Sequence, residues 1–232
     1  FGTKIEYYSF IYANSCNFNM NDYLQLRKFG SIPVSHQNLT SLLKGYKSPN
    51  DKIRDWVHKG YLIPLVRGMY AIHADITGSK PSSLTVANMQ YGPSYVSLEY
   101  ALSYYQAIPE MVMEISSVTT KRNKTIENTL GRFTYIHLPL PYFSYGIRSV
   151  QVASNQYALI ATPEKALFDT IVCTRRLVLR SRRDVLAWIE DMRIDESWLA
   201  ELDLETMHQL VEFAPKRSSL QQLLKVLHVY AS

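Results

Sequence analysis

The sequence predicts an α+β fold with two domains, on three observations. Residues 39–72 show the patterns of a helix, a turn, a second helix and a tight hairpin, in that order. Four segments between residues 112 and 162 carry strand-type residues, and the gaps between them are too short for parallel crossover helices. From residue 182 onward the pattern indicates three or four helices. We therefore expect a small N-terminal domain and a larger mixed domain with a mainly antiparallel sheet and C-terminal helices.

The first helix of residues 39–72 is expected just before Gly45. Leu39, Leu42 and Leu43 lie three and four residues apart, which gives one buried stripe. Glycine readily adopts the positive φ angle that ends such a helix, so the helix should end near Lys44.

The second helix is expected from Ser48, a preferred capping residue, to Gly60. Pro49 follows at the first helical position, where its missing N–H costs nothing. The inner face of this second helix consists of Ile53, Trp56 and Val57. The remaining polar side chains suit base edges and phosphates in a major groove; they are Asn50, Lys52, Arg54, Asp55 and Lys59.

A hairpin should follow, with residues 61–66 and 69–72 as its arms and Arg67 and Gly68 at a basic tip. Pro64 lacks a donor for the strand ladder, so its arm should be an edge strand. Helix, turn, helix and hairpin is the order of a winged helix-turn-helix, which makes double-stranded DNA the first partner to consider. The alternative is a helix pair that packs on a hairpin as a protein-interaction module.

We predict that the second helix lies in the major groove. Asn50, Lys52 and Arg54 would contact bases or adjacent phosphates, and the other cations would contact mainly phosphates. The full predicted set is Lys44, Lys47, Ser48, Asn50, Lys52, Arg54, Lys59 and Arg67.

Five longer segments are distinctive: GYLIPLVRGMYAI, YGPSYVSLEYALSYYQAIPE, VTTKRNKT, LGRFTYIHLP and ALIATPEKALFD. Together, over residues 21–174, the chain resembles the AbiEi family of antitoxins, transcriptional regulators found beside nucleotidyltransferase toxins in bacterial type IV toxin-antitoxin systems. The resemblance implies a winged helix that represses its own operon and a larger domain needed to neutralise the toxin. Residues 175–232 match no motif of the family.

The expected domains are a winged helix over residues 20–76 and an α+β antitoxin domain over residues 77–232, separated by a break near residues 75–83. Residues 1–19 would be an extension, with Met20 as the biological start. We expect a cytoplasmic protein with no membrane segment, since no apolar run approaches the roughly 20 residues of a bilayer span. Cys16 and Cys173 fit free thiols in a reducing compartment, although a disulfide is possible.

The net charge of +5 is unevenly distributed along the chain. Residues 184–232 carry four Lys or Arg against nine Asp or Glu, whereas a basic cluster lies directly before them. Such a cluster should meet anions, namely a phosphate backbone, an acidic partner or the acidic C-terminal helices, or else form a solvated loop and helix start. It consists of Arg175, Arg176, Arg180, Arg182 and Arg183.

An enzyme is the least favoured interpretation. A metal-dependent nuclease needs a carboxylate pair with a lysine, and Glu99, Glu164, Lys165 and Asp169 lie next to the motifs. Their spacing matches no known site, and Glu164 and Lys165 suit a helix start with a solvated lysine. The six histidines are scattered without metal-ligand spacing. We therefore predict no catalytic residue, no metal and no cofactor.

A row of tyrosines near residue 100 allows two interpretations. Stacking on unpaired bases is one, and packing in the core with hydroxyls at the rim is the other, which we favour. The row consists of Tyr91, Tyr95, Tyr100, Tyr104 and Tyr105.

Overall fold

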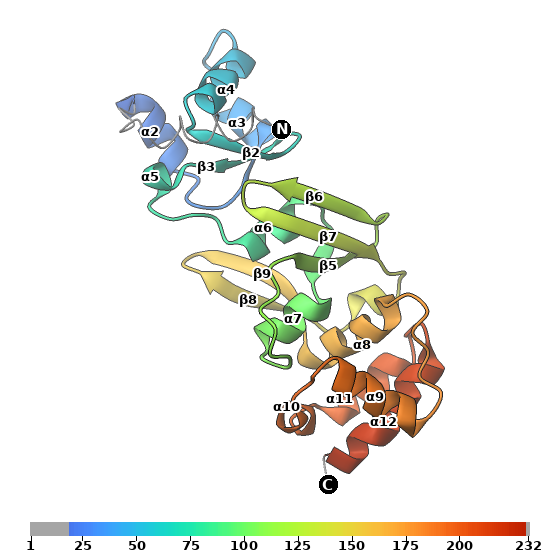
Figure 1. Ribbon diagram of the computed structural model, residues 1–232. Helices are drawn as coiled ribbons and strands as arrows, with labels where there is room; N and C mark the ends of the chain where they lie inside the picture. Colours follow the sequence, from blue (N-terminus) through green and yellow to red (C-terminus); the bar gives the residue numbers. More distant parts are fainter. Residues whose placement is uncertain (1–18, 231–232) are drawn as a thin grey trace, which may run out of the picture. The chain divides into compact units, whose positions relative to one another are not determined.

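The computed structural model describes residues 19–230 and has an α+β fold (Figure 1). It divides into two compact units, one ending at Ser82 and the other beginning at Ser83. The boundary expected after residue 76 falls inside α5 (Ala74–Thr77), a helix that packs on α2 (Met20–Arg27) of the first unit. Of the expected extension, residues 1–19, only Asn19 lies within the described residues, and its side chain caps α2.

The first unit has four helices and a three-stranded antiparallel sheet within its described residues. The strand order is β1-β3-β2, so among these residues β2 is an edge strand, as Pro64 predicted. In chain order the elements are α2 (Met20–Arg27), β1 (Val34–Ser35), α3 (His36–Leu42), α4 (Pro49–His58), β2 (Leu62–Val66), β3 (Met69–Ile72) and α5 (Ala74–Thr77).

The core of the first unit forms where α3 and α4 meet the sheet. Leu39, Leu43, Ile53 and Trp56 are buried, which confirms most of the two apolar faces read from the sequence. Because they interlock with residues from α2 and β2, the position of α4 is fixed against the hairpin. Ser48 is the N-cap of α4, but its side chain makes no capping hydrogen bond to the described residues.

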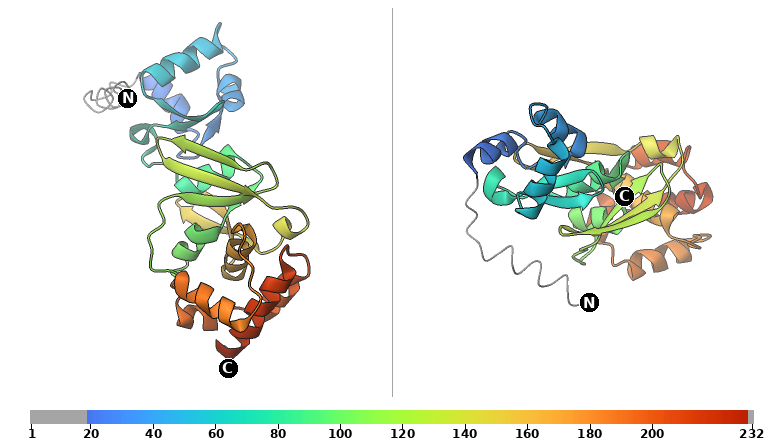
Figure 2. Two further views of the ribbon diagram at one scale, coloured as in Figure 1. Left: turned by 45° about the vertical axis from the view of Figure 1, so that its right-hand side comes forward. Right: turned by 90° about the horizontal axis from the view of Figure 1, so that it is seen from above.

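The second unit is built on a mixed six-stranded sheet, counted over its described residues, in the order β6-β7-β5-β4-β9-β8 (Figure 2). Its first part contains α6 (Ser83–Gln90), β4 (Ser94–Val96), α7 (Leu98–Tyr104), β5 (Ile115–Thr119), β6 (Lys124–Asn128), β7 (Gly131–His137), the 3-10 helix η1 (Tyr142–Ser144), β8 (Ile147–Ala153) and β9 (Gln156–Ala161).

The sheet is mainly antiparallel, as expected, but two of its pairings are parallel. β4 pairs with β9 and β5 pairs with β7 in parallel, while the other three pairings are antiparallel. The reason lies in β6, which forms a hairpin with β7 on its outer side. This hairpin returns the chain to its original direction, so that β7 lies parallel to β5 without a crossover helix.

Helices complete the second unit, as the sequence predicted from residue 182 onward. α8 contacts β9 and α7, and it also contacts α11 and α12 of the C-terminal group (Figure 1). Within residues 19–230 no helix is both long and apolar enough to span a membrane. The helices are α8 (Pro163–Cys173), α9 (Arg182–Asp191), α10 (Glu196–Ala200), α11 (Leu204–Val211) and α12 (Arg217–Tyr230).

Candidate nucleic-acid interface

The polar residues of α4 divide between two faces. Asn50, Arg54 and His58 lie four residues apart and line one groove, because four residues make slightly more than one helical turn. Lys52 and Lys59 do not line this groove, and both form ion pairs with Asp55, which lies at its edge. The prediction that all of them share one face is therefore wrong, because the helical period separates them.

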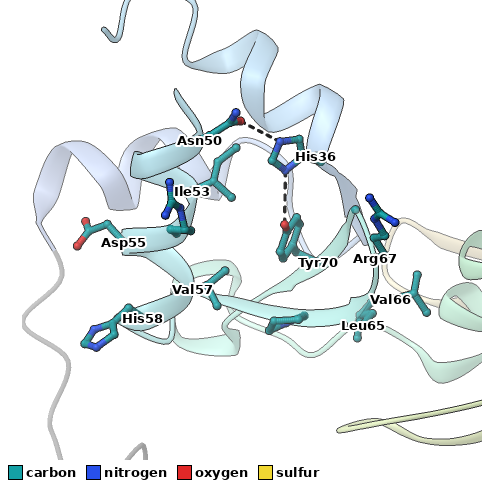
Figure 3. Close-up of a pocket in the computed structure, with 13 residues that line it drawn as sticks. His36, Asn50, Ile53, Asp55, Val57, His58, Leu65, Val66, Arg67 and Tyr70 are labelled. Atoms are coloured by element: carbon teal, nitrogen blue, oxygen red, sulfur yellow. Dashed lines mark hydrogen bonds between the residues drawn. The ribbon is translucent and has the colours of Figure 1, made fainter. Parts of the chain in front are cut away.

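The groove lies between α4 and the β2–β3 hairpin and has a volume of about 840 Å³ (Figure 3). Its lining combines apolar side chains with polar ones from both elements. Arg67 and Gly68 come from the hairpin tip, where Gly68 has a φ of +79° that suits glycine. The apolar part of the lining consists of Ile53, Val57, Pro64, Leu65 and Val66.

A chain of hydrogen bonds holds Asn50 at one end of this groove (Figure 3). The Nε2 atom of His36 lies 3.0 Å from Oδ1 of Asn50, and the hydroxyl of Tyr70 lies 3.4 Å from Nδ1 of His36. His36 can donate from Nε2 and accept at Nδ1, so one tautomer satisfies both contacts. The Nδ2 amide of Asn50 is then oriented by the protein. His36 and Tyr70 were not among the predicted site residues, because only the fold brings them close to Asn50.

Lys52 is engaged within the protein. Its Nζ atom lies 2.8 Å from Oδ2 of Asp22, and this carboxylate is only 2% exposed. The same ammonium group lies 5.6 Å from the ring centre of Trp56. The structure thus gives Lys52 a partner in α2 and directs it away from the groove.

Two other predicted cations form surface ion pairs. Lys59 donates to Asp55 at 2.7 Å, and this hydrogen bond raises the pKa of Lys59. Arg54 pairs with Asp51, but its side chain is 80% exposed. Exposed pairs of this kind contribute little stability and exchange readily for other anions. Arg54 therefore stays accessible to a ligand in the groove.

The remaining predicted residues are exposed: Lys44, Lys47 and Ser48 lie in the turn between α3 and α4, and Arg67 lies at the hairpin tip. Within the described part of the chain, the three cations have no ion pair. The structure thus brings Asn50, Arg54 and Arg67 together at one groove and places the two turn lysines before α4.

The arginine cluster follows α8 and extends into the first turn of α9, and all of its side chains are exposed. None of them forms an ion pair with another described residue. Asp184 instead caps α9, and its pKa is lowered chiefly because its carboxylate accepts the backbone N–H of Arg180. The cluster comprises Arg175, Arg176, Arg180, Arg182 and Arg183.

Two of the four residues considered for a nuclease, Lys165 and Asp169, belong to a buried network, whereas Glu99 and Glu164 are only partly buried. Lys165 and Asp169 are fully buried in α8, with 2.9 Å between Nζ and Oδ1. Ser97 and Tyr95 donate to Oδ2 of Asp169 at 2.7 and 2.9 Å. Burial lowers the pKa of Lys165, an effect that the neighbouring carboxylate opposes.

The expectation that Lys165 is solvated is therefore wrong, because α8 packs against α7 and β9 on the face that carries it. Its hydrocarbon stem also lies against Gly146, where a Cβ would approach the Cβ of Lys165 to 2.7 Å. Tyr95 is fully buried beside it, as the core-packing interpretation of the tyrosine row predicted, whereas Tyr104 of the same row is 45% exposed. Cys16 lies outside the described residues, and Cys173 is a free thiol.

The fold is similar to the crystal structure of the Rv2827c protein from Mycobacterium tuberculosis. The TM-score is 0.57 at 14% sequence identity, and the alignment covers 88% of this chain and 75% of that chain. At this identity the likeness concerns the fold alone. No protein family model matches the sequence. No curated protein matches it either.

Proposed function

We propose that this chain is an AbiEi-like antitoxin that represses its own operon. The first unit would act as a winged helix-turn-helix on double-stranded promoter DNA, and the second would counteract a nucleotidyltransferase toxin. The family motifs, which lie between residues 60 and 169, support the assignment of both roles.

One observation carries the DNA-binding part of the proposal: α4 presents Asn50 and Arg54 at the same groove as Arg67. Amide and guanidinium groups are the side chains that read adenine and guanine edges. Lys44 and Lys47, exposed in the turn before α4, would contact phosphates. We no longer expect Lys52 to contact DNA, because it forms an ion pair with Asp22. Lys59 would contact DNA only if a phosphate replaced Asp55 as its ion-pair partner.

Two assays test the two roles. For repression, a reporter is placed behind the region upstream of the operon and the chain is supplied in trans. We expect repression by the wild type and derepression by the Arg54→Ala/Arg67→Ala variant at equal protein level.

For neutralisation, the chain is co-expressed with a nucleotidyltransferase encoded beside it, and growth should be restored. An unrepressed reporter contradicts the first role, and unrelieved growth arrest contradicts the second.

The apolar lining of the groove favours a second candidate function, a protein-interaction module. Val57, Pro64 and Val66, the partly or fully exposed apolar residues of the lining, would then contact apolar side chains of a partner protein. The two functions differ in their response to Val57→Asp. A protein partner should be lost because a charge enters an apolar contact, whereas binding to DNA through the groove rim should change less than it does in Arg54→Ala.

A further inference from the structure

Two histidines that are 20 residues apart in the sequence meet on the surface of the C-terminal helices. His208 belongs to α11 and His228 to α12, and their Nε2 atoms lie 3.2 Å apart. The ring centres are 5.4 Å apart and the rings are tilted by 36°. Each imidazole thus directs the same nitrogen toward the other. The sequence has no His-rich motif here, so the pair was not predicted. The two histidines meet only because their helices pack together.

The backbone that carries the pair is anchored in the core. α11 packs on α12, and the buried residues Met207 and Leu227 directly precede the two histidines in the chain. Both imidazoles are exposed and line one groove of about 580 Å³, which Glu212 also lines. The two nitrogens are therefore held close together at a place that a small ion can enter.

The separation suits a shared metal ion. With metal–nitrogen bonds of about 2.0–2.1 Å and a tetrahedral angle, two imidazole nitrogens lie roughly 3.3–3.4 Å apart. Conversion of the present contact into a bidentate site needs a change of a few tenths of an ångström in this distance and a rotation of both rings that aims their Nε2 lone pairs at one point off the line between the two nitrogens. The imidazole that donates from Nε2 would move its proton to Nδ1, so that both Nε2 lone pairs face the ion.

We propose that His208 and His228 bind one divalent transition-metal ion that prefers imidazole nitrogen, such as Zn²⁺, Ni²⁺ or Cu²⁺. Within residues 19–230 no third His, Cys, Asp or Glu completes a metal-binding group, so water fills the other coordination positions. Arg217 and Lys225 also line the groove and repel a cation. The site is thus an exchangeable one that joins α11 to α12 when occupied. It is independent of the DNA-binding proposal.

The test is isothermal titration calorimetry of the full, tag-free chain with Zn²⁺, and with Mg²⁺ as the ion that prefers oxygen ligands. The variants are His208→Gln and His228→Gln, which keep a polar side chain on the surface. His58→Gln is the matched control, because it removes one exposed histidine of the first unit. Circular dichroism verifies that each variant is folded, and thermal melts with and without Zn²⁺ provide a second measurement.

We expect one Zn²⁺ per chain and no Mg²⁺ binding for the wild type and His58→Gln. Either change in the pair should weaken Zn²⁺ binding by about tenfold or more, because one of only two protein ligands is lost. Zn²⁺ should raise the melting temperature only where the pair is intact. Absence of Zn²⁺ binding to the wild type, full binding by either pair variant, or an equal loss in His58→Gln would overturn the proposal.

Discussion

The imidazole of His36 lies 3.0 Å from the side-chain oxygen of Asn50, and this contact ties the start of α3 to the first turn of α4. The hydroxyl of Tyr70, on β3, approaches the other ring nitrogen of His36. Asn50 is thereby oriented by groups from two other elements before any ligand arrives. A base-reading amide gains from such orientation, because less side-chain freedom is lost on binding.

Replacing His36 by alanine should weaken binding to the cognate upstream DNA by about threefold to tenfold, consistent with the roughly 1 kcal/mol of a single hydrogen bond. Binding to random DNA should change little, because the amide of Asn50 reads bases rather than phosphates. Fluorescence anisotropy on both duplexes measures the two effects. Equal losses on the two duplexes would show that His36 supports the fold of the first unit and not base recognition.

Arg54 and Lys47 should differ in their effect on specificity. Arg54→Ala should cost about 1–3 kcal/mol of discrimination between cognate and random DNA, the range of one bidentate base contact. Lys47→Ala should lower the affinity for every duplex and reduce the slope of log affinity against log salt by about 1. Titrations at several salt concentrations separate the two patterns, and identical behaviour of both variants would refute these assignments.

Lys52→Ala should destabilise the first unit by about 1–3 kcal/mol, because the nearly buried carboxylate of Asp22 loses its charged partner. Lys59→Ala is the matched control, since the exposed pair with Asp55 contributes about 0–1 kcal/mol. Urea unfolding reports the difference when it is followed by tryptophan fluorescence in chains that also carry Trp188→Phe and Trp198→Phe, so that Trp56 is the tryptophan that remains. If the two variants are equally stable and Lys52→Ala instead loses DNA affinity, Lys52 belongs to the interface.

Because of Tyr135, the stability of the second unit should fall as the pH rises in the alkaline range. Burial raises the pKa of its phenol from 10.0 to about 12. Between these values the unfolded chain has lost this proton while the folded chain retains it, so stability falls as pH rises. The hydroxyl also donates to the carbonyl of Ala87 at 2.8 Å.

Tyr135→Phe should therefore be about 1 kcal/mol less stable than the wild type near pH 8, where its hydrogen bond is missing. This deficit should shrink as the pH rises above 10, by at most about 1.4 kcal/mol per pH unit, so that it vanishes near pH 11 and the variant becomes the more stable chain above that pH, because phenylalanine has no proton to lose. Urea unfolding at pH 8, 10 and 11 measures it. A deficit that is constant with pH would contradict the cause given for the pKa shift.

The elements with strong periodicity were predictable. Leu39, Leu43, Ile53 and Trp56 define α3 and α4 because each apolar stripe repeats at helical spacing. β4 was missed because it has three residues, and β6 because its sequence KTIEN has one apolar side chain. Local pattern also carries no information on which strand lies beside which, and this is why the parallel pairs were not foreseen.

The candidate site was predictable only in part. Sequence identified the exposed cations around α4, but the partner of Lys52 is Asp22, 30 residues away. The burial of Lys165 could not be predicted from the sequence either, because a residue that follows Thr162 and Pro163 in the first turn of a helix is usually exposed to solvent. Contacts between distant residues determine which polar side chains are available, and these contacts arise from packing.

The central claim is that the first unit reads an operator sequence. Its most direct test is a fluorescence-anisotropy titration of the full chain against its own upstream region and a scrambled duplex of equal length, at two salt concentrations. We predict about a hundredfold tighter binding to the upstream region, equivalent to about 2.7 kcal/mol. Equal and strongly salt-dependent binding to both duplexes, or no binding to either, would contradict the claim.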